Sequence, residues 1–264
     1  MEMISELKIL TGVRSDNTYL KSAYYTRPFK VANVREERTD PVLRLMMMSS
    51  SPGMLDGDHY RLDIQVTAGA SLQLKTQAYQ RLFSMQNGAR QEMKVDMAAG
   101  SSFTFLPHPL VPHHDAIYNG HTQLYLAENC RLIWGEIVTC GRKLNGEIFR
   151  FKKLRNLTEV YLHSKLVLRD HLLMEPENMN LATLGWMEDY THQASLICFD
   201  TRPARQWAKV TEGIAAYLDQ QEGVLGGVTV VHENGIMVRL LGHKGEQLFN
   251  CQHDLANIFN DLNT

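Results

Sequence analysis

Apolar and polar residues alternate along much of the chain before about residue 200, which predicts β-strands with one buried face. Between about residues 58 and 136 the alternation forms a weak internal repeat, in which a strand leads into a small or polar pair and alternation then resumes. Its copies are Tyr60 to Leu74, Glu92 to Leu106 and Thr122 to Trp134, with a fourth, poorer copy through Glu159 to Leu168. Each copy therefore predicts a strand, a corner and a second strand.

The corners of this repeat are predicted at Gly69, Gly100 and Asn129, which recur about every thirty residues. A period of that length is typical of architectures in which identical units stack on one another. We therefore expect a mainly β fold of solenoid-like (β-helix-type) stacked strands, with a small number of C-terminal helices.

Helical periodicity is convincing only near the C-terminus. A first helix is predicted between Pro203 and Gly223, on the apolar stripe Trp207, Val210, Ile214 and Leu218. A second is predicted from Asp254, as its N-cap, to Leu262. Between them, Gly227 to Leu241 predicts a hairpin around Asn234-Gly235, a pair that readily adopts the positive φ angles of a tight turn.

The 264 residues contain no Pro-rich or Ser-rich linker. We therefore expect one domain over residues 1–264, with a β body over about 1–200 and a partly helical section over about 201–264.

The charge of the chain is nearly balanced, with 27 Lys and Arg against 29 Asp and Glu and a formal net charge of -2. Such a balance disfavours a broad electrostatic grip on nucleic acid or on an anionic membrane surface. No apolar run approaches the roughly 20 residues that span a bilayer. We therefore predict neither nucleic acid nor membrane as a partner.

The four cysteines are far apart, with no CxxC pair, so they predict buried, reduced thiols. The N-terminus carries acidic residues where a signal peptide has basic ones. Both observations favour a cytoplasmic protein.

Familiar catalytic motifs are absent from the sequence: there is no GxxxxGK[ST], GxGxxG, HExxH or GxSxG. The densest polar cluster is the segment from Pro107 to Asp115, which holds His108, His113 and His114, with His121 just beyond. Imidazole and carboxylate groups suit nickel or zinc. The alternative is a proline-stiffened surface loop with solvated histidines.

Three other features could serve either a metal-binding or catalytic role or a purely structural one. Met46 to Met48 offer thioethers, but methionines usually fill core space or a partner interface. Asp56 and Asp58 form a carboxylate pair, although Asp beside Gly is also ordinary turn chemistry. Glu136 lies at the end of an apolar strand, where its carboxylate needs either water or a cation. A structural ion pair with Arg142 would meet that need.

An ordered set of short segments resembles one family, the urease accessory proteins called UreD, or UreH in some organisms. No single segment is diagnostic, but their order and spacing over about residues 50 to 150 are similar to those of the family. The segments are Pro52 to Asp58, Gly69-Ala70, Thr76-Gln77, Gly88 to Gln91, Leu106-Pro107, Trp134 to Ile137, Gly141-Arg142 and Gly146 to Phe149. The chain departs from the commoner family pattern at Ser51 to Met54 and at Gln80 to Phe83.

The resemblance implies a non-enzymatic role in urease maturation. It implies a scaffold that binds the urease apoprotein and the UreF accessory protein, which carries the GTPase UreG, with two copies in the larger complex. Nickel would be inserted into the urease active site, with an internal channel as the proposed route. The resemblance implies no tightly bound cofactor, and nickel only in transit.

Nickel in transit needs ligands that bind it and release it again, which favours scattered carboxylates over a closed cage. Within the region of resemblance we predict conduit or structural roles for Asp58, Glu136 and Glu147, with Arg142 in support. His113 and His114 are the alternative metal ligands. For a partner surface we predict Trp207, Ile258 and Phe259, because amphipathic helices on a β body commonly dock partners; covering the end of the core is the other interpretation of those helices.

Two enzymatic alternatives stay open at this point. A carbohydrate-active enzyme on a β-solenoid would use Asp56, Asp58 and Glu136 as acid and base. A metal-dependent hydrolase would use His113, His114 and Asp115, and would hold zinc tightly.

Overall fold

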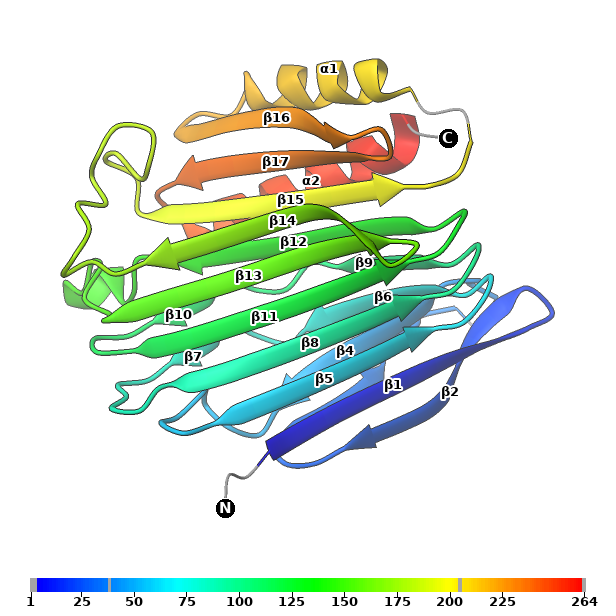
Figure 1. The fold of residues 1–264 in the computed structure, drawn as a ribbon, viewed down its shortest axis with the longest axis horizontal. Helices are drawn as coiled ribbons and strands as arrows, with labels where there is room; N and C mark the ends of the chain where they lie inside the picture. Colours follow the sequence, from blue (N-terminus) through cyan, green and yellow to red (C-terminus); the bar gives the residue numbers. More distant parts are fainter. Residues whose placement is uncertain (1–3, 38, 204–205, 263–264) are drawn as a thin grey trace.

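A computed structural model describes residues 4–37, 39–203 and 206–262 and folds them mainly into two facing β-sheets (Figure 1). The seven-stranded sheet has the order β14 (Lys165–Met174), β13 (Lys153–Leu162), β11 (Ile117–Leu126), β8 (Ala89–Met97), β5 (His59–Val66), β1 (Ile4–Arg14) and β2 (Asn17–Tyr25). The ten-stranded sheet has the order β16 (Val224–His232), β17 (Gly235–Gly242), β15 (His192–Asp200), β12 (Arg131–Thr139), β9 (Ser102–Phe105), β6 (Ser71–Thr76), β4 (Leu43–Ser49) and β3 (Phe29–Asn33), with β7 (Gln80–Leu82) and β10 (Leu110–Pro112) beside it.

The three predicted corners are confirmed. At each of them the chain passes from the seven-stranded sheet to the ten-stranded one, and Gly69, Gly100 and Asn129 have φ angles of 69°, 71° and 58°. Successive corners stack, because the Gly69 amide donates to Ala99 O at 3.0 Å and the Gly100 amide donates to Glu128 O at 3.0 Å. Equivalent strands of successive copies consequently lie parallel within each sheet.

The expectation of a β-helix-type solenoid is not met in full. The mainly β class with C-terminal helices holds, but both sheets are mixed, with antiparallel strands toward their edges, and neither closes on itself. The fourth copy, Glu159 to Leu168, is not a corner. Its turn at His163-Ser164 joins β13 to its antiparallel neighbour β14 within one sheet.

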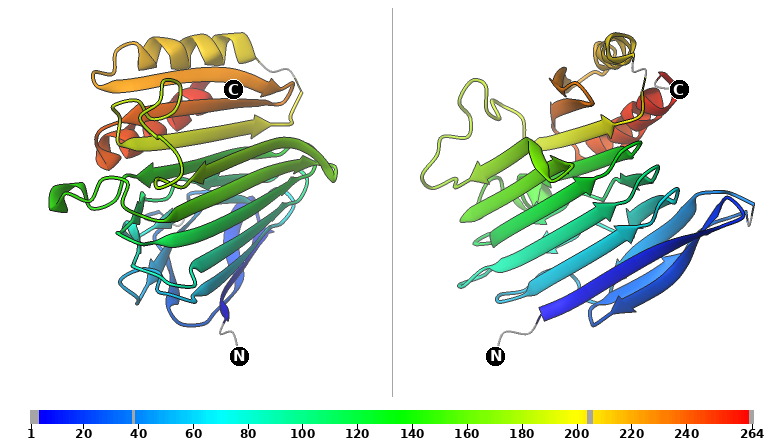
Figure 2. Two further views of the ribbon diagram at one scale, coloured as in Figure 1. Left: turned by 60° about the vertical axis from the view of Figure 1, so that its left-hand side comes forward. Right: turned by 45° about the vertical axis from the view of Figure 1, so that its right-hand side comes forward.

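Two apolar clusters hold these layers together. The larger lies between the sheets, and the smaller lies between the ten-stranded sheet and the helices α1 (Trp207–Leu218) and α2 (Gly245–Leu262) (Figure 2). Strand β12 serves both, because Leu132 and Trp134 face the first cluster while Ile133 and Ile137 face the second. That double burial explains why its sequence is almost continuously apolar.

Two of the three C-terminal elements form where the sequence predicts them. Helix α1 and the β16–β17 hairpin form where they were predicted. Helix α2 begins at Gly245, so Asp254 lies inside it and is not its N-cap. The extra turns contribute Leu248 and Cys251 to the smaller cluster. Neither helix in the described part of the chain combines the length and the apolar character that crossing a membrane requires.

A buried amide fastens α2 to the ten-stranded sheet. Gln252 is fully buried, and its Nε2 donates to Glu136 O at 3.1 Å and to Ser195 O at 2.8 Å. The amide fits only because residue 135 is glycine: a methyl group there would lie 2.7 Å from Leu106 Cδ2 and 2.9 Å from Gln252 Oε1.

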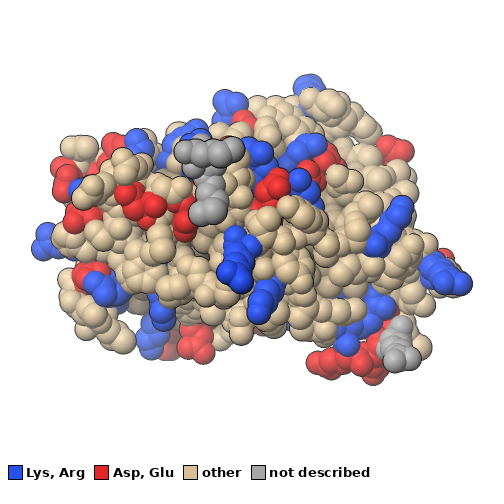
Figure 3. All heavy atoms as spheres, turned by 90° about the horizontal axis from the view of Figure 1, so that it is seen from below, with Lys and Arg blue, Asp and Glu red and all other residues tan. Residues whose placement is uncertain are grey.

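The outer face of the seven-stranded sheet carries a buried carboxylate. Glu159 is 4% exposed, and its oxygens lie 3.0 Å from His121 Nε2, 2.9 Å from Arg169 Nε and 3.0 Å from the Tyr161 hydroxyl. Hydrogen bonding to His121 first, and then to Arg169 and Tyr161, lowers the pKa of Glu159 to about 2 despite its burial. Elsewhere charges of both signs are interspersed, as the face in Figure 3 shows.

We predict that Gly135→Ala lowers the free energy of unfolding by about 1–3 kcal/mol, because overpacking must displace the Gln252 amide or Leu106. Gly227→Ala is the matched control, since a methyl group there meets nothing within 4 Å. Urea unfolding of both variants measures the difference. Equal stability of the two variants would contradict the proposed packing role of Gly135.

We predict that Glu159→Gln destabilises the protein by about 1–2 kcal/mol at pH 7. The folded-state pKa is depressed, so this stabilisation is complete above the unfolded glutamate pKa of about 4.3 and is lost as the pH falls toward 2. Thermal unfolding from pH 7 to pH 2 should show the two proteins converging. Asp96→Asn, which removes an exposed pair with Lys94, should cost less than about 0.5 kcal/mol.

Candidate functional site

A cavity of about 650 Å³ lies between the two sheets; we call it the inner cavity. Its deep end is formed by buried aromatic side chains, among them Tyr118 and Trp134, together with Thr122, Asn156 and Glu136. Its exposed lining residues are Ser49, Pro52, Gln77, Ala78, Tyr79 and Arg81. The cavity therefore opens between the end of β4 and the β6–β7 connection.

Glu136 projects into the inner cavity from β12. Its Oε1 accepts hydrogen bonds from Trp134 Nε1 at 3.0 Å and from the Thr158 hydroxyl at 2.8 Å. Burial raises the pKa of Glu136 above its usual range, and hydrogen bonds from Thr158 and Trp134 oppose that rise only in part. The surface that this side chain retains faces the cavity, which explains why it is half-buried yet strongly desolvated.

The predicted pair of Glu136 with Arg142 does not form. Arg142 instead binds Glu147, through Nε at 2.8 Å and through a second guanidinium nitrogen. Glu147 also accepts from the His114 amide at 3.3 Å. This ion pair lies in the segment that follows β12, outside the lining of the inner cavity, and it holds the pKa of Glu147 below its usual range.

The two aspartates near residue 57 have different surroundings. Asp56 Oδ1 accepts from the backbone amides of Gln86, Asn87 and Gly88 at 2.8 to 3.1 Å, which agrees with a turn role. Asp58 Oδ2 accepts from the Leu55 amide at 2.8 Å and from the Tyr60 hydroxyl at 3.3 Å. Because Tyr60 lines the inner cavity, Asp58 lies one side chain away from it.

The histidine-rich segment does not converge on one point. His113 is 8% exposed and packs edge-on against Phe83, and burial lowers its pKa. His114 is exposed and pairs with Asp115 at 2.9 Å, while His121 belongs to the Glu159 cluster on the outer face. No group of three His, Cys, Asp or Glu side chains in the described ranges could hold a metal ion.

His108 is the histidine of this segment that reaches the inner cavity. Its Nδ1 lies 2.9 Å from the Thr76 hydroxyl, and its ring stacks on Phe249 of α2 with centroids 4.7 Å apart. Met47 and Met48 also line the cavity, so this part of the methionine run lines an internal space. The four cysteines are buried free thiols, as predicted.

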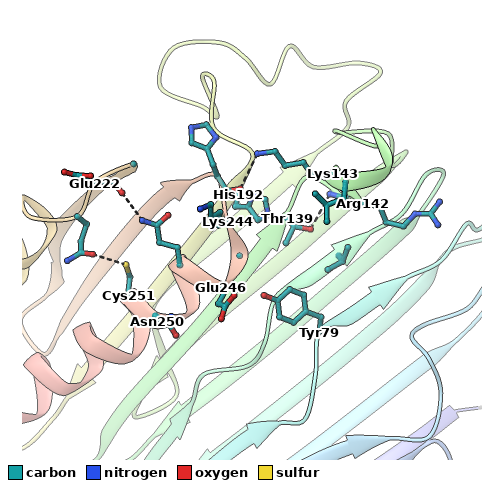
Figure 4. Close-up of a pocket in the computed structure, with 18 of the residues that line it drawn as sticks. Tyr79, Thr139, Arg142, Lys143, His192, Glu222, Lys244, Glu246, Asn250 and Cys251 are labelled. Atoms are coloured by element: carbon teal, nitrogen blue, oxygen red, sulfur yellow. Dashed lines mark hydrogen bonds between the residues drawn. The ribbon is translucent and has the colours of Figure 1, made fainter.

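Beside the cavity mouth lies an open groove of about 1170 Å³, bounded by the turn η1 (Lys143–Asn145), the start of α2 and Gln221 to Gly223. Tyr79 lines both the groove and the inner cavity, and Glu246 of α2 lies near it (Figure 4). Burial, and then the nearby Lys143 and His243, lower the pKa of His192 to about 4. The groove brings together segments far apart in the sequence, and sequence reasoning did not predict it.

The residues predicted for partner binding pack mainly against the protein itself. Phe259 is fully buried, so it cannot touch a partner in this conformation. Trp207 donates through Nε1 to Glu233 O at 2.7 Å and stacks on Phe259, while Ile258 is half-buried against the smaller cluster. Only Trp207 and Ile258 keep surface for a partner.

Sequence reasoning found Glu136 but missed the polar groups around it. Tyr118, Thr158 and Asn156 occupy inward positions of β11 and β13, whose other inward residues include the buried Leu124, Leu154 and Val160. A polar residue at an inward position of such a strand was the available signal. This signal does not predict which polar residues of different strands lie in contact.

Comparisons with known proteins match the chain along nearly its whole length. The family model described as UreD urease accessory protein matches residues 5–263. A protein of Flavobacterium johnsoniae named urease accessory protein UreD is 46% identical over 249 residues, covering 94% of this chain and 90% of that protein. A protein of the same name from Haemophilus influenzae is 35% identical over 93% of this chain and 95% of its own length. The chain therefore belongs to the UreD family of urease accessory proteins.

Proposed function

We propose that this chain is a scaffold for urease maturation, which binds the urease apoprotein and the UreF accessory protein, with UreG carried by UreF, so that nickel is inserted into urease. Membership of the family supports a role in urease maturation. The sequence has no phosphate-binding loop, which is consistent with nucleotide chemistry on a partner. We further propose that two copies take part in the larger complex.

The inner cavity is the proposed route for nickel in transit, and Glu136 inside it is the observation on which this proposal rests. A carboxylate in a low-dielectric space attracts a divalent cation strongly. A single carboxylate with nearby amide and hydroxyl oxygens also lacks the closed geometry that would retain the ion. Binding followed by release is what a conduit requires.

The other predicted residues take secondary places in this proposal. Asp58 accepts a hydrogen bond from Tyr60, which lines the cavity, and would act as a second transient binding site for nickel. Glu147 would have to exchange Arg142 for the cation, so we assign it a supporting role outside the cavity. His113 is engaged in packing, which leaves the exposed His114 as the weaker alternative.

For a partner surface we propose the side of α1 and α2 that exposes Trp207 and Ile258. Phe259 would support Trp207 from beneath through ring stacking at 6.1 Å. The covering of the smaller apolar cluster by the same helices shows that they also have a structural task.

The proposed function is tested by reconstituting urease apoprotein with nickel, bicarbonate, GTP and the other accessory proteins, with and without this chain. Bound nickel and urease activity are both measured. Nickel loading that is equal without the chain would overturn the proposal.

In this assay Glu136→Gln should lower the rate of nickel loading by about tenfold or more while the complex still assembles. The amide keeps the shape of the side chain but loses the charge that attracts the cation. Glu92→Gln, on the outer face of the seven-stranded sheet, is the matched control and should load nickel at the normal rate. A fully active Glu136→Gln variant would exclude the conduit role of this carboxylate.

The same substitution should stabilise the isolated chain at neutral pH. The folded-state pKa of Glu136 is raised, so its ionisation costs stability as the pH rises through that pKa. Glu136→Gln should therefore melt at a higher temperature than the wild type at pH 7, and the difference should vanish below the ordinary glutamate pKa of about 4.3. Calorimetry at both pH values measures this, and a variant less stable at pH 7 would argue that the carboxylate has a structural role.

A further inference from the structure

The inner cavity is larger and more apolar than a metal ion alone requires. A nickel-sized ion needs ligand atoms at about 2 Å, whereas a volume of about 650 Å³ falls within the range of about 300–1,000 Å³ seen for organic ligands. Its walls include the rings of Phe29, Tyr60, Phe105, Tyr118 and Trp134. A space of this size and composition matches the general features of a small-molecule site.

Two of these aromatic rings lie beside the carboxylate. Trp134 donates to Glu136 and packs against Phe105 with ring centroids 4.9 Å apart. Tyr118, which lines the same cavity, is 4% exposed, and burial and then the charge of Glu136 raise its pKa. A cation bound to Glu136 would therefore lie beside the aromatic side chains of the cavity wall.

Glu136 has no cationic partner of its own. In the described part of the chain, no Lys or Arg side chain forms an ion pair with it, and its two hydrogen-bond donors at Oε1 are the uncharged Trp134 and Thr158. A buried carboxylate without a cation is costly. A ligand that brings a positive charge would offset that cost.

The cavity is also accessible from outside. Its mouth lies between Ser49 to Gly53 and Gln77 to Arg81, and the Tyr79 ring at the mouth is 40% exposed. Gln80 and Gln91, whose side chains are 3.2 Å apart, provide polar contacts along the way to Glu136.

We propose that the inner cavity binds a small organic cation of the amidinium or guanidinium class, with its charged end on Glu136 and its apolar part against Trp134, Phe105 and Tyr118. A planar cation with two N–H donors matches a carboxylate in geometry as well as charge. The inference does not depend on the nickel route, because its direct consequence is ligand binding to the isolated chain. Where nickel does use the cavity, such a cation would compete with it.

The test compares benzamidinium with benzamide, which has nearly the same shape but no charge, by calorimetry and by amide NMR on the isolated full chain. Benzamidinium should bind about tenfold more tightly or better, the ratio expected for a charge-assisted hydrogen bond. The chain has three tryptophans, so three indole N–H signals report on position. Only the Trp134 signal should shift, because that N–H donates to Glu136. Trp186→Phe and Trp207→Phe variants assign the other two.

In Glu136→Gln the preference for benzamidinium should disappear, whereas Glu92→Gln should keep it. The NMR experiment on the wild-type chain decides the question even if Glu136→Gln fails to fold. Equal affinity for the two probes, no binding at millimolar concentration, or shifts at Trp186 or Trp207 without a shift at Trp134 would overturn the proposal. If Glu136→Gln loads nickel at the normal rate in the reconstitution assay, that result would exclude the conduit role of Glu136 but would not decide whether the cavity binds an organic cation.

Discussion

Parallel stacking of the strand–corner–strand units fixes which side chains meet in this protein. Because β5, β8, β11 and β13 pair in parallel register, Tyr60, Gln91, Gly120 and Asn156 form one row across the seven-stranded sheet. Thr122 and Thr158 lie opposite each other in the same way. These inward rows contain polar side chains and a glycine, where a core strand would normally place apolar bulk. The space between the sheets is therefore open at this level and closed by apolar residues elsewhere.

Glu136 faces these rows from the other sheet, so the protein keeps an ionisable carboxyl group where folding alone would favour an apolar residue. Hydrogen bonds from Trp134 and Thr158 hold the carboxylate without neutralising it. A desolvated carboxylate of raised pKa inside an accessible cavity is a typical feature of functional sites, which often cost stability. The proposed conduit would give that cost a reason, since a conduit must hold a metal ion and then release it.

The C-terminal helices connect the outside of the molecule to the strand that carries Glu136. Gln252 of α2 reaches the backbone of β12 and β15 through the gap left by Gly135, and Phe249 of the same helix stacks on His108 at the cavity wall. Helix α2 thus contacts β12 on one side and borders the groove on another. Any partner that rests on α2 therefore lies on an element in direct contact with the cavity wall.

The sequence by itself determined the strands of the repeat, the corners at Gly69, Gly100 and Asn129, helix α1, the β16–β17 hairpin and the family, because these depend on local periodicity, turn chemistry and short motifs. It did not determine the start of α2, whose first turns are specified by packing on the ten-stranded sheet. Nor did it determine the partners of the charged residues: Arg142 binds Glu147 and not Glu136, and His121 binds Glu159, far from His113. Alternation tells which side chains of a strand point inward, but only the register between strands and the distance between sheets decide which of them meet. The inner cavity and the groove are therefore properties of the tertiary structure alone.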